Sequence, residues 1–142
     1  MAESVFLHLV REAGLESQIE VDSAGTGDWH IGQRPHEGTL RILKTNGIAE
    51  GSSARQICLS DLNEFDYLVV MDNSNLSNVR ALGSGRGQVV RLLDFVPEVG
   101  NKEVPDPYFT GDFEGVYALI RRGCETLLEH IQREANLSPR NN

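Results

Sequence analysis

Hydrophobic positions follow helical spacing in some stretches of the chain and strand spacing in others. Apolar residues recur at three- and four-residue steps between Ala2 and Ala13, which predicts an amphipathic helix ended by Gly14. A second helix is predicted from Glu37 to Asn46, with Gly47 after its last turn. The longest helical pattern forms one apolar stripe near the end of the chain, made of Phe113, Tyr117, Ile120, Cys124, Leu127, Leu128 and Ile131.

Short apolar runs between these helices predict strands. Tyr67 to Met71 is a continuous apolar run of the kind found in buried parallel strands. Weaker runs predict strands from Ile19 to Val21 and from Val89 to Leu93, and a short extended segment from Ala54 to Ile57. The polar stretch that begins at Asp72 supplies capping residues for a further helix, through about Leu82. Strands that alternate with helices predict a three-layer α/β fold, in which helices cover both faces of a small parallel sheet.

The chain is predicted to form one domain. Its 142 residues, 39% of them hydrophobic, are enough to bury one core. No internal repeat or low-complexity segment divides the sequence. We therefore expect a single domain over residues 1–135 and a flexible tail over residues 136–142.

The composition excludes several classes of partner. A balance of 13 basic against 21 acidic residues gives a net charge of -8, which repels polyanions, so neither nucleic acid nor an anionic membrane is an expected partner. The sequence has no apolar run that could span a membrane and no signal-peptide pattern, and we expect a cytoplasmic protein. Two cysteines are too few for a disulfide framework, and the four histidines show no metal-ligand spacing, so no metal or other cofactor is expected.

Five short strings, in order along almost the whole chain, resemble the low-molecular-weight protein tyrosine phosphatase family. Each string alone is weak, but five in register are hard to obtain by chance. The resemblance implies an α/β sheet of order 2-1-3-4 and hydrolysis of phosphotyrosine proteins or small aryl phosphates through a phosphocysteine intermediate, without a cofactor. The strings are Ala2-Glu3 with Phe6, Val21-Asp22-Ser23-Ala24-Gly25-Thr26, Ala54-Arg55-Gln56, Met71-Asp72-Asn73-Ser74-Asn75-Leu76 and Val104-Pro105-Asp106-Pro107-Tyr108-Phe109.

The family's first strand and its phosphate-binding loop, Cys-x5-Arg-Ser/Thr-Pro, do not occur in this sequence. In the family this piece stands directly ahead of the helix that here opens at Met1, where no capping residue precedes the first turn. Neither cysteine replaces the motif, because the sixth residue after Cys58 is Glu64 and the sixth after Cys124 is His130. Both are expected to be free thiols, packed or half-packed in the fold. We therefore expect an N-terminally truncated chain that lacks the first strand and the nucleophile and is inactive as it stands.

The resemblance assigns the general acid to Asp106. In the family this carboxyl protonates the leaving phenolate and then activates water against the phosphocysteine. Pro105 and Pro107 restrict the backbone on both sides and predict a stiff loop. A phenol has a pKa of about 10, so a positioned acid contributes roughly 10²- to 10⁴-fold in rate. Outside the family context, an aspartate beside prolines is typical of an ordinary turn.

Two aromatic residues match the walls of the family's substrate crevice. Trp29, in a Gly-rich loop, is expected to stack on the phosphotyrosine ring, and Tyr108 is expected to form the opposite wall. The alternative for Trp29 is a plug in the core, and for Tyr108 plain loop packing. Phe109 stands where other members carry a second tyrosine, so regulatory phosphorylation at that position is excluded.

Three polar residues are expected to support the site. Asp72 and Asn75 follow a buried strand, and their expected role is to cap the next helix and to buttress the phosphate loop. Arg55 either braces a neighbouring carboxylate or is a solvated surface residue.

The sequence leaves alternatives open. One is a non-catalytic fragment or binding module of the same fold. Thioredoxin-coupled arsenate reductases and protein arginine phosphatases share the scaffold. The reductases need further redox cysteines. The arginine phosphatases lack a Trp-lined crevice and a Tyr after the acid's Pro, so Trp29 and Tyr108 favour phosphotyrosine. A phosphoacceptor receiver domain, with Asp72 as acceptor, requires an acidic pair after its first strand, and that strand is not in this sequence.

Overall fold

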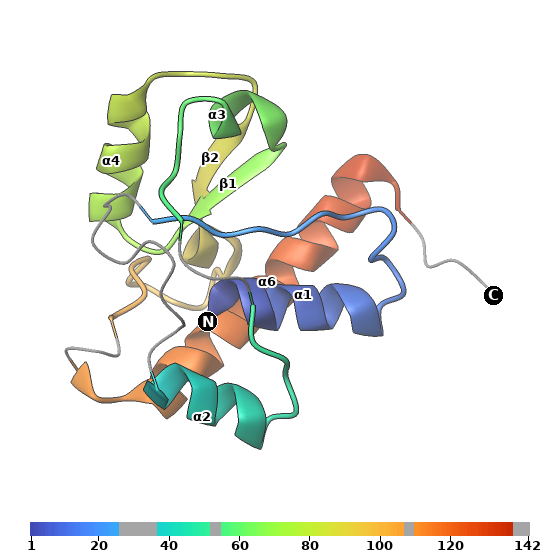
Figure 1. The fold of residues 1–142 in the computed structure, drawn as a ribbon, viewed down its shortest axis with the longest axis vertical. Helices are drawn as coiled ribbons and strands as arrows, with labels where there is room; N and C mark the ends of the chain where they lie inside the picture. Colours follow the sequence, from blue (N-terminus) through green and yellow to red (C-terminus); the bar gives the residue numbers. More distant parts are fainter. Residues whose placement is uncertain (26–36, 52–54, 107–109, 138–142) are drawn as a thin grey trace.

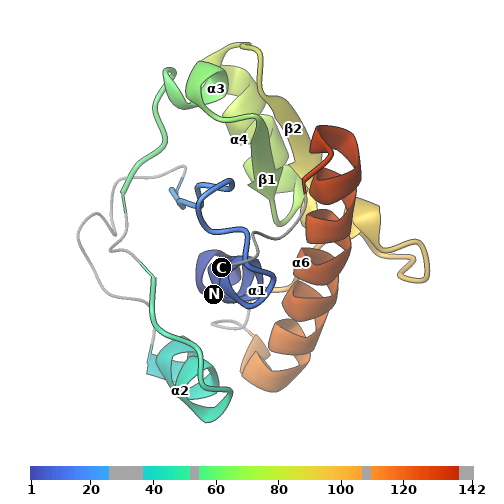
Figure 2. The same cartoon turned by 90° about the vertical axis from the view of Figure 1, so that its right-hand side faces the viewer.

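Two parallel strands lie between helices in this computed structural model (Figure 1). The structure describes residues 1–25, 37–51, 55–106 and 110–137. Helix α4 packs on one side of the sheet, and α6 runs along the other side with α1 packed against it (Figure 2). In chain order the elements are α1 (Ala2–Glu12), α2 (Glu37–Thr45), α3 (Asp61–Glu64), β1 (Tyr67–Val70), α4 (Asn73–Leu82), β2 (Gln88–Arg91), the 3-10 helix η1 (Leu92–Phe95) and α6 (Phe113–Ala135).

The predicted helices are confirmed within a residue or two at their ends. Helix α1 stops just ahead of Gly14, with φ of +71°, and α2 stops ahead of Gly47, with φ of +69°. Both values lie in the left-handed region that glycine adopts without steric cost, so these glycines end the helices as their positions predicted. Met1 precedes α1 and makes no side-chain capping hydrogen bond.

The parallel sheet is confirmed, and its register follows the apolar run of β1. Tyr67 pairs with Gln88 and Val70 with Arg91. Leu68 and Val70 are buried, on the face that packs with α3 and α4 through Leu62 and Val79. The described residues thus contain a two-stranded parallel sheet within the α/β fold, and the absence of a first strand from the order 2-1-3-4 remains a prediction.

The prediction of a strand at Ile19 to Val21 is wrong for the described part of the chain. This segment is not hydrogen-bonded to a neighbouring strand, and the nearest regular pairing is an isolated parallel bridge between Gly25 and Gln56. A strand requires a partner, and apolar spacing alone does not supply one. Ile19 and Val21 instead pack, partly buried, against the core.

The strand predicted from Val89 to Leu93 ends earlier than expected. Arg91 is its last residue, and the chain then turns into η1 instead of continuing to Leu93. The backbone N–H of Arg91 donates to Asp94 Oδ2 at 3.1 Å, and its Nε donates to Asp94 Oδ1 at 3.1 Å. This local capping closes a turn that buries Leu92 and Leu93 against α6.

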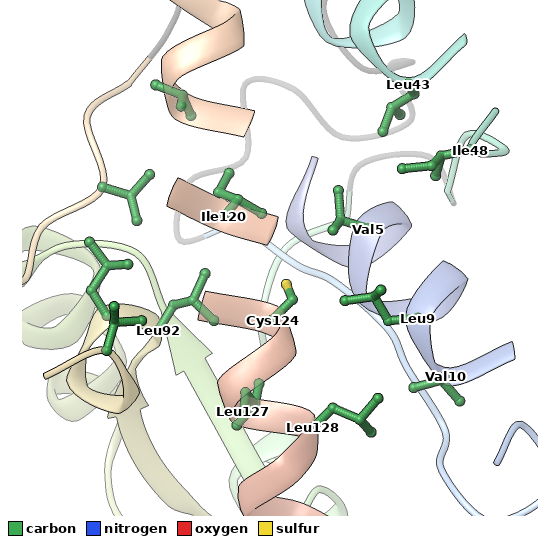
Figure 3. Close-up of a cluster of buried hydrophobic side chains, with 14 of the residues drawn as sticks. Val5, Leu9, Val10, Leu43, Ile48, Leu92, Ile120, Cys124, Leu127 and Leu128 are labelled. Carbon is green, nitrogen blue, oxygen red and sulfur yellow. The ribbon is translucent and has the colours of Figure 1, made fainter. Parts of the chain in front are cut away.

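The main core lies between α1 and α6 (Figure 3). Val5 and Leu9 of α1 face Ile120 and Cys124 of α6, and all four are buried. The apolar stripe predicted for the last helix is therefore the main surface that holds the helices together. No helix of the described residues is long and apolar enough to cross a membrane. Of the predicted tail, Asn136 ends α6 in the left-handed region with φ of 56°.

Candidate functional site

The loop that carries Asp106 is attached to the carboxyl end of β1. The backbone N–H of Val104 donates to the carbonyl oxygen of Met71, the residue after β1, at 2.8 Å. Val104 is buried, whereas Pro105 and Asp106 are exposed. The N–H of Thr110 donates to the Asp106 carbonyl at 3.2 Å. An exposed carboxylate therefore lies beyond the carboxyl edge of a parallel sheet, where α/β proteins collect their reactive groups.

The same edge holds the first turn of α4. Asp72 Oδ1 accepts a hydrogen bond from the N–H of Asn75 at 2.7 Å, and Asn75 Oδ1 accepts from the N–H of Met71 at 3.4 Å. Asp72 is therefore the N-cap of α4, and this predicted role is confirmed. The reciprocal contact of Asn75 ties the first turn to the end of β1, so the strand end, the helix start and the acid loop share one anchoring point at Met71.

The two predicted aromatic walls lie outside the described residues. Trp29 belongs to residues 26–36 and Tyr108 to residues 107–109. Their roles therefore remain predictions. Gly25 is the last described residue ahead of the first of these segments, and Asp106 is the last ahead of the second.

Cys124 is sealed in the core. Only 1% of the residue is exposed, and burial raises the pKa of its thiol to about 12. Figure 3 shows its sulfur among the side chains of α6 and α1. The predicted packed thiol is confirmed here, and such a group is an inert neutral thiol at pH 7.

Cys58 is exposed, contrary to the prediction of a packed or half-packed thiol. Its Sγ lies 3.1 Å from Ser60 Oγ and 3.5 Å from Asp61 Oδ2, and its N–H donates to the same Asp61 oxygen at 2.9 Å. Exposure follows from its place in the turn that leads into α3. Phosphate binding needs hydrogen-bond donors, whereas Asp61 presents an acceptor beside this thiol.

Arg55 binds two carboxylates, so the first of its two predicted roles, bracing a neighbouring carboxylate, is confirmed. Its Nε donates to Asp22 at 3.1 Å, and its two terminal nitrogens donate to Asp61 at 3.0 and 3.2 Å. The guanidinium lowers the pKa of Asp61, which is 5% exposed, and the hydrogen bond to Asp61 raises the pKa of Arg55. Backbone bonds from Gly25 N–H to Arg55 O and from Ile57 N–H to Gly25 O, both 2.8 Å, complete the junction.

Asp106 lines neither of two cavities formed by the described residues. The larger one, of about 460 Å³, lies along α1, and it is lined by Glu3, Ser4, Leu7, His8, Arg11, Gly47, Ala49, Glu50 and Gly51. A smaller one, of about 230 Å³, lies between the acid loop and the start of α6, and it is lined by Pro105, Thr110, Asp112, Gly115, Val116 and Leu119. Within the described ranges, no three His, Cys, Asp or Glu side chains are grouped so that they could hold a metal ion.

Comparison with known proteins gives close matches over nearly the whole chain. The family described as low molecular weight phosphotyrosine protein phosphatase matches residues 1–137. The low molecular weight protein-tyrosine-phosphatase YfkJ of Bacillus subtilis is 47% identical over 140 residues, which span 96% of this chain and 90% of YfkJ. The crystal structure of YfkJ has a TM-score of 0.90 and covers 94% of this chain and 86% of its own.

Two further relatives widen the comparison. Low molecular weight protein-tyrosine-phosphatase PtpA of Staphylococcus epidermidis is 37% identical over 141 residues, which span 99% of this chain and 90% of PtpA. The crystal structure of a Drosophila arginine phosphatase is 31% identical, with a TM-score of 0.85, and covers 92% of this chain and 88% of its own.

Proposed function

The chain belongs to the low molecular weight phosphotyrosine protein phosphatase family, and from this membership we propose that Asp106 is the general acid of a cysteine-dependent phosphatase. Its substrates are phosphotyrosine proteins and small aryl phosphates. The observation that carries the proposal is the hydrogen bond from Val104 N–H to Met71 O, which supports an exposed carboxylate beyond the carboxyl end of β1.

The proposed reaction has two steps. A cysteine thiolate attacks phosphorus, the bond from phosphorus to the phenolic oxygen breaks, and the Asp106 carboxyl gives its proton to the leaving phenolate. The Asp106 carboxylate then takes a proton from water as the water oxygen attacks phosphorus, which releases inorganic phosphate and the free thiolate. No metal or other cofactor takes part, because the positive charge that binds the phosphoryl oxygens comes from an arginine and backbone N–H groups.

The nucleophile of this reaction is not among the 142 residues. Cys124 has a neutral thiol in the core, Cys58 lies beside the carboxylate of Asp61, and neither stands in a Cys-x5-Arg sequence. We therefore propose that these residues supply the scaffold and the acid, and that they do not turn over substrate unless a strand and a Cys-x5-Arg loop precede α1. Within the described residues Ile19 to Val21 has no strand partner, which agrees with the same proposal, since its neighbour in a 2-1-3-4 sheet is the first strand.

Phosphotyrosine is preferred to phosphoarginine as the substrate. The support is the sequence, in which Trp29 and Tyr108 match the aromatic walls of a crevice for a planar ring. The similarity to the Drosophila arginine phosphatase makes phosphoarginine the second candidate. The two candidates are separated by the release of phosphate from a phosphotyrosine peptide and from the matching phosphoarginine peptide, measured with the chain preceded by a Cys-x5-Arg loop. A faster reaction of the phosphoarginine peptide would contradict the preference.

Two proteins test the proposed division of labour. The first is the 142-residue chain, and the second is the same chain preceded by an apolar strand and a Cys-x5-Arg-Ser-Pro loop. We expect p-nitrophenyl phosphate hydrolysis from the second protein alone. Turnover by the 142-residue chain that is lost when Cys58 or Cys124 is replaced by serine would overturn the proposal, as would an inactive second protein that is shown to be folded.

A further inference from the structure

We propose that Glu103 is a positioning residue, which holds the loop of the general acid Asp106 against the first turn of α4. This inference rests on the proposed function of Asp106. Glu103 Oε1 accepts a hydrogen bond from the backbone N–H of Asn73 at 3.1 Å, although the two residues lie 30 positions apart. Glu103 stands three residues ahead of Asp106, so its contact fixes the chain that leads directly into the acid.

The contact uses a donor that α4 leaves free. The first N–H groups of a helix have no partner within the helix, and Asp72 takes the one at Asn75. Glu103 takes the N–H of Asn73, the first residue of α4. A carboxylate is also the group that the positive end of a helix favours. The first turn of α4 is thus shared between its own N-cap and the acid loop.

Three successive residues attach the loop to three different elements. Lys102 Nζ donates to the carbonyl oxygen of Val96, after η1, at 2.6 Å. Glu103 contacts α4, and Val104 N–H donates to Met71 O after β1 at 2.8 Å. Val104 is buried, whereas Glu103 and its partner Asn73 are exposed. Removal of the Glu103 carboxylate therefore loosens the loop without opening the core.

The receiving side of this contact is itself held in place. Arg91, at the end of β2, donates through Nη1 to Asn73 Oδ1 at 3.1 Å. The same guanidinium contacts Asp94. Asn73 is consequently tied to the end of β2 as well as to the helix that follows β1. Its hydrogen bond to Glu103 therefore fixes the loop relative to the ends of both strands.

The position of the loop matters because a general acid acts only within hydrogen-bond distance of the leaving oxygen. A displacement of about 1 Å can cost roughly 10²-fold in rate. Loss of the Glu103 anchor should therefore slow reactions that need a proton on the leaving group. It should leave reactions of very acidic phenols nearly unchanged, since their phenolates leave without a proton.

Amide hydrogen exchange on the 142-residue protein tests the anchor without any need for activity. We expect Glu103→Ala to accelerate exchange of the Val104 amide about three- to tenfold, as is typical of a lost capping contact, while amides of α6 keep their rates. Glu103→Gln keeps an acceptor oxygen and should restore most of the protection. Glu98→Ala is the matched control, because Glu98 lies in the same connection but contacts Arg122 of α6. Unchanged Val104 exchange in Glu103→Ala would overturn the proposal.

A second pair of variants isolates the donor. Asn73→Pro removes the N–H at the first helical position, where proline is tolerated, and Asn73→Ala removes only the side chain. Asp72, with φ of -148° and ψ of 176°, already has the extended backbone that precedes proline. We expect Asn73→Pro to accelerate Val104 exchange more than Asn73→Ala, and Glu103→Ala to add nothing in the Asn73→Pro background. Full additivity of the two changes would contradict a contact between them.

Kinetics then test the link to catalysis, in the chain preceded by the Cys-x5-Arg loop. Glu103→Ala should lower kcat/KM, which reports the step in which the phenolate leaves, about tenfold for phenyl phosphate and less than twofold for 2,4-dinitrophenyl phosphate. Equal losses for both substrates would overturn the positioning role. If no variant is active while Val104 exchange responds as expected, the proposed function fails and the anchor stands; the two failures are thus distinguishable.

Discussion

The buried thiol of Cys124 gives a sharp test of which cysteines can react. With a pKa of about 12, the thiol is ionised in roughly one molecule in 10⁵ at pH 7, whereas an ordinary cysteine with a pKa of about 8.5 is ionised in roughly 3%. Alkylation requires the thiolate and physical access, and Cys124 is only 1% exposed. We expect iodoacetamide at pH 7 to modify Cys58 in the native protein at least about 10³-fold faster than Cys124.

Mass spectrometry of the peptides that contain each cysteine measures both rates. In 6 M guanidinium chloride the two cysteines should react alike, because unfolding removes the burial that raises the pKa of Cys124. The variant Cys58→Ser should take up almost no label until it unfolds. Rapid native labelling of Cys58→Ser at pH 7 would refute the burial argument, and it would reopen the question of Cys124 as a nucleophile.

Two further predictions concern stability and are measured by urea unfolding. Arg55→Ala should destabilise the fold by about 1–3 kcal/mol, less than the 3–5 typical of a broken buried pair because Arg55 is 35% exposed. Arg55 lowers the pKa of Asp61, so its contribution to stability is present above the unfolded pKa of about 3.9 and is lost as pH falls through the folded pKa. The difference in unfolding free energy between the parent chain and Arg55→Ala should therefore shrink in acid. A difference that grows there would contradict this sign. Gly123→Ala places a Cβ 2.6 Å from Leu92 Cγ and should destabilise by about 1–3 kcal/mol, although alanine favours a helix; a stabilised variant would show that Leu92 has room to move.

Elements whose cause is local could be predicted from the sequence. The stripe on α6, the run of β1 and the Asp72 cap each depend on residues within a few positions of one another. Gly14 and Gly47 likewise mark helix ends through their own backbone preferences. These features need no knowledge of distant contacts.

Features that depend on distant partners could not be predicted. Ile19 to Val21 has the composition of a strand, but pairing is decided by a neighbour that the local pattern does not specify. Arg55 and Asp22 are 33 positions apart, and Glu103 and Asn73 are 30 apart. Asp106 was found through family resemblance, whereas the residue proposed to position it carries no sequence signal, because an exposed glutamate before a loop is usually only solvated.

The turn at Asp94 lies between these two cases. Its carboxylate contacts Arg91 only three positions away, so the capping geometry is local. The turn could not be told from the strand in the segment Val89 to Leu93, since a buried strand and a buried 3-10 turn share the same composition. An acidic residue soon after such a run is the signal that would have placed the strand end at Arg91.

The role of Asp106 as the general acid is tested most directly by its dependence on the leaving group. The comparison uses Asp106 and Asp106→Asn forms of the chain preceded by the Cys-x5-Arg loop. We predict that Asp106→Asn lowers kcat/KM, which reports the step in which the phenolate leaves, by roughly 10²- to 10⁴-fold for phenyl phosphate and by far less for 2,4-dinitrophenyl phosphate, whose phenolate leaves unprotonated. Equal losses for the two substrates, or no loss for phenyl phosphate, would show that another group donates the proton.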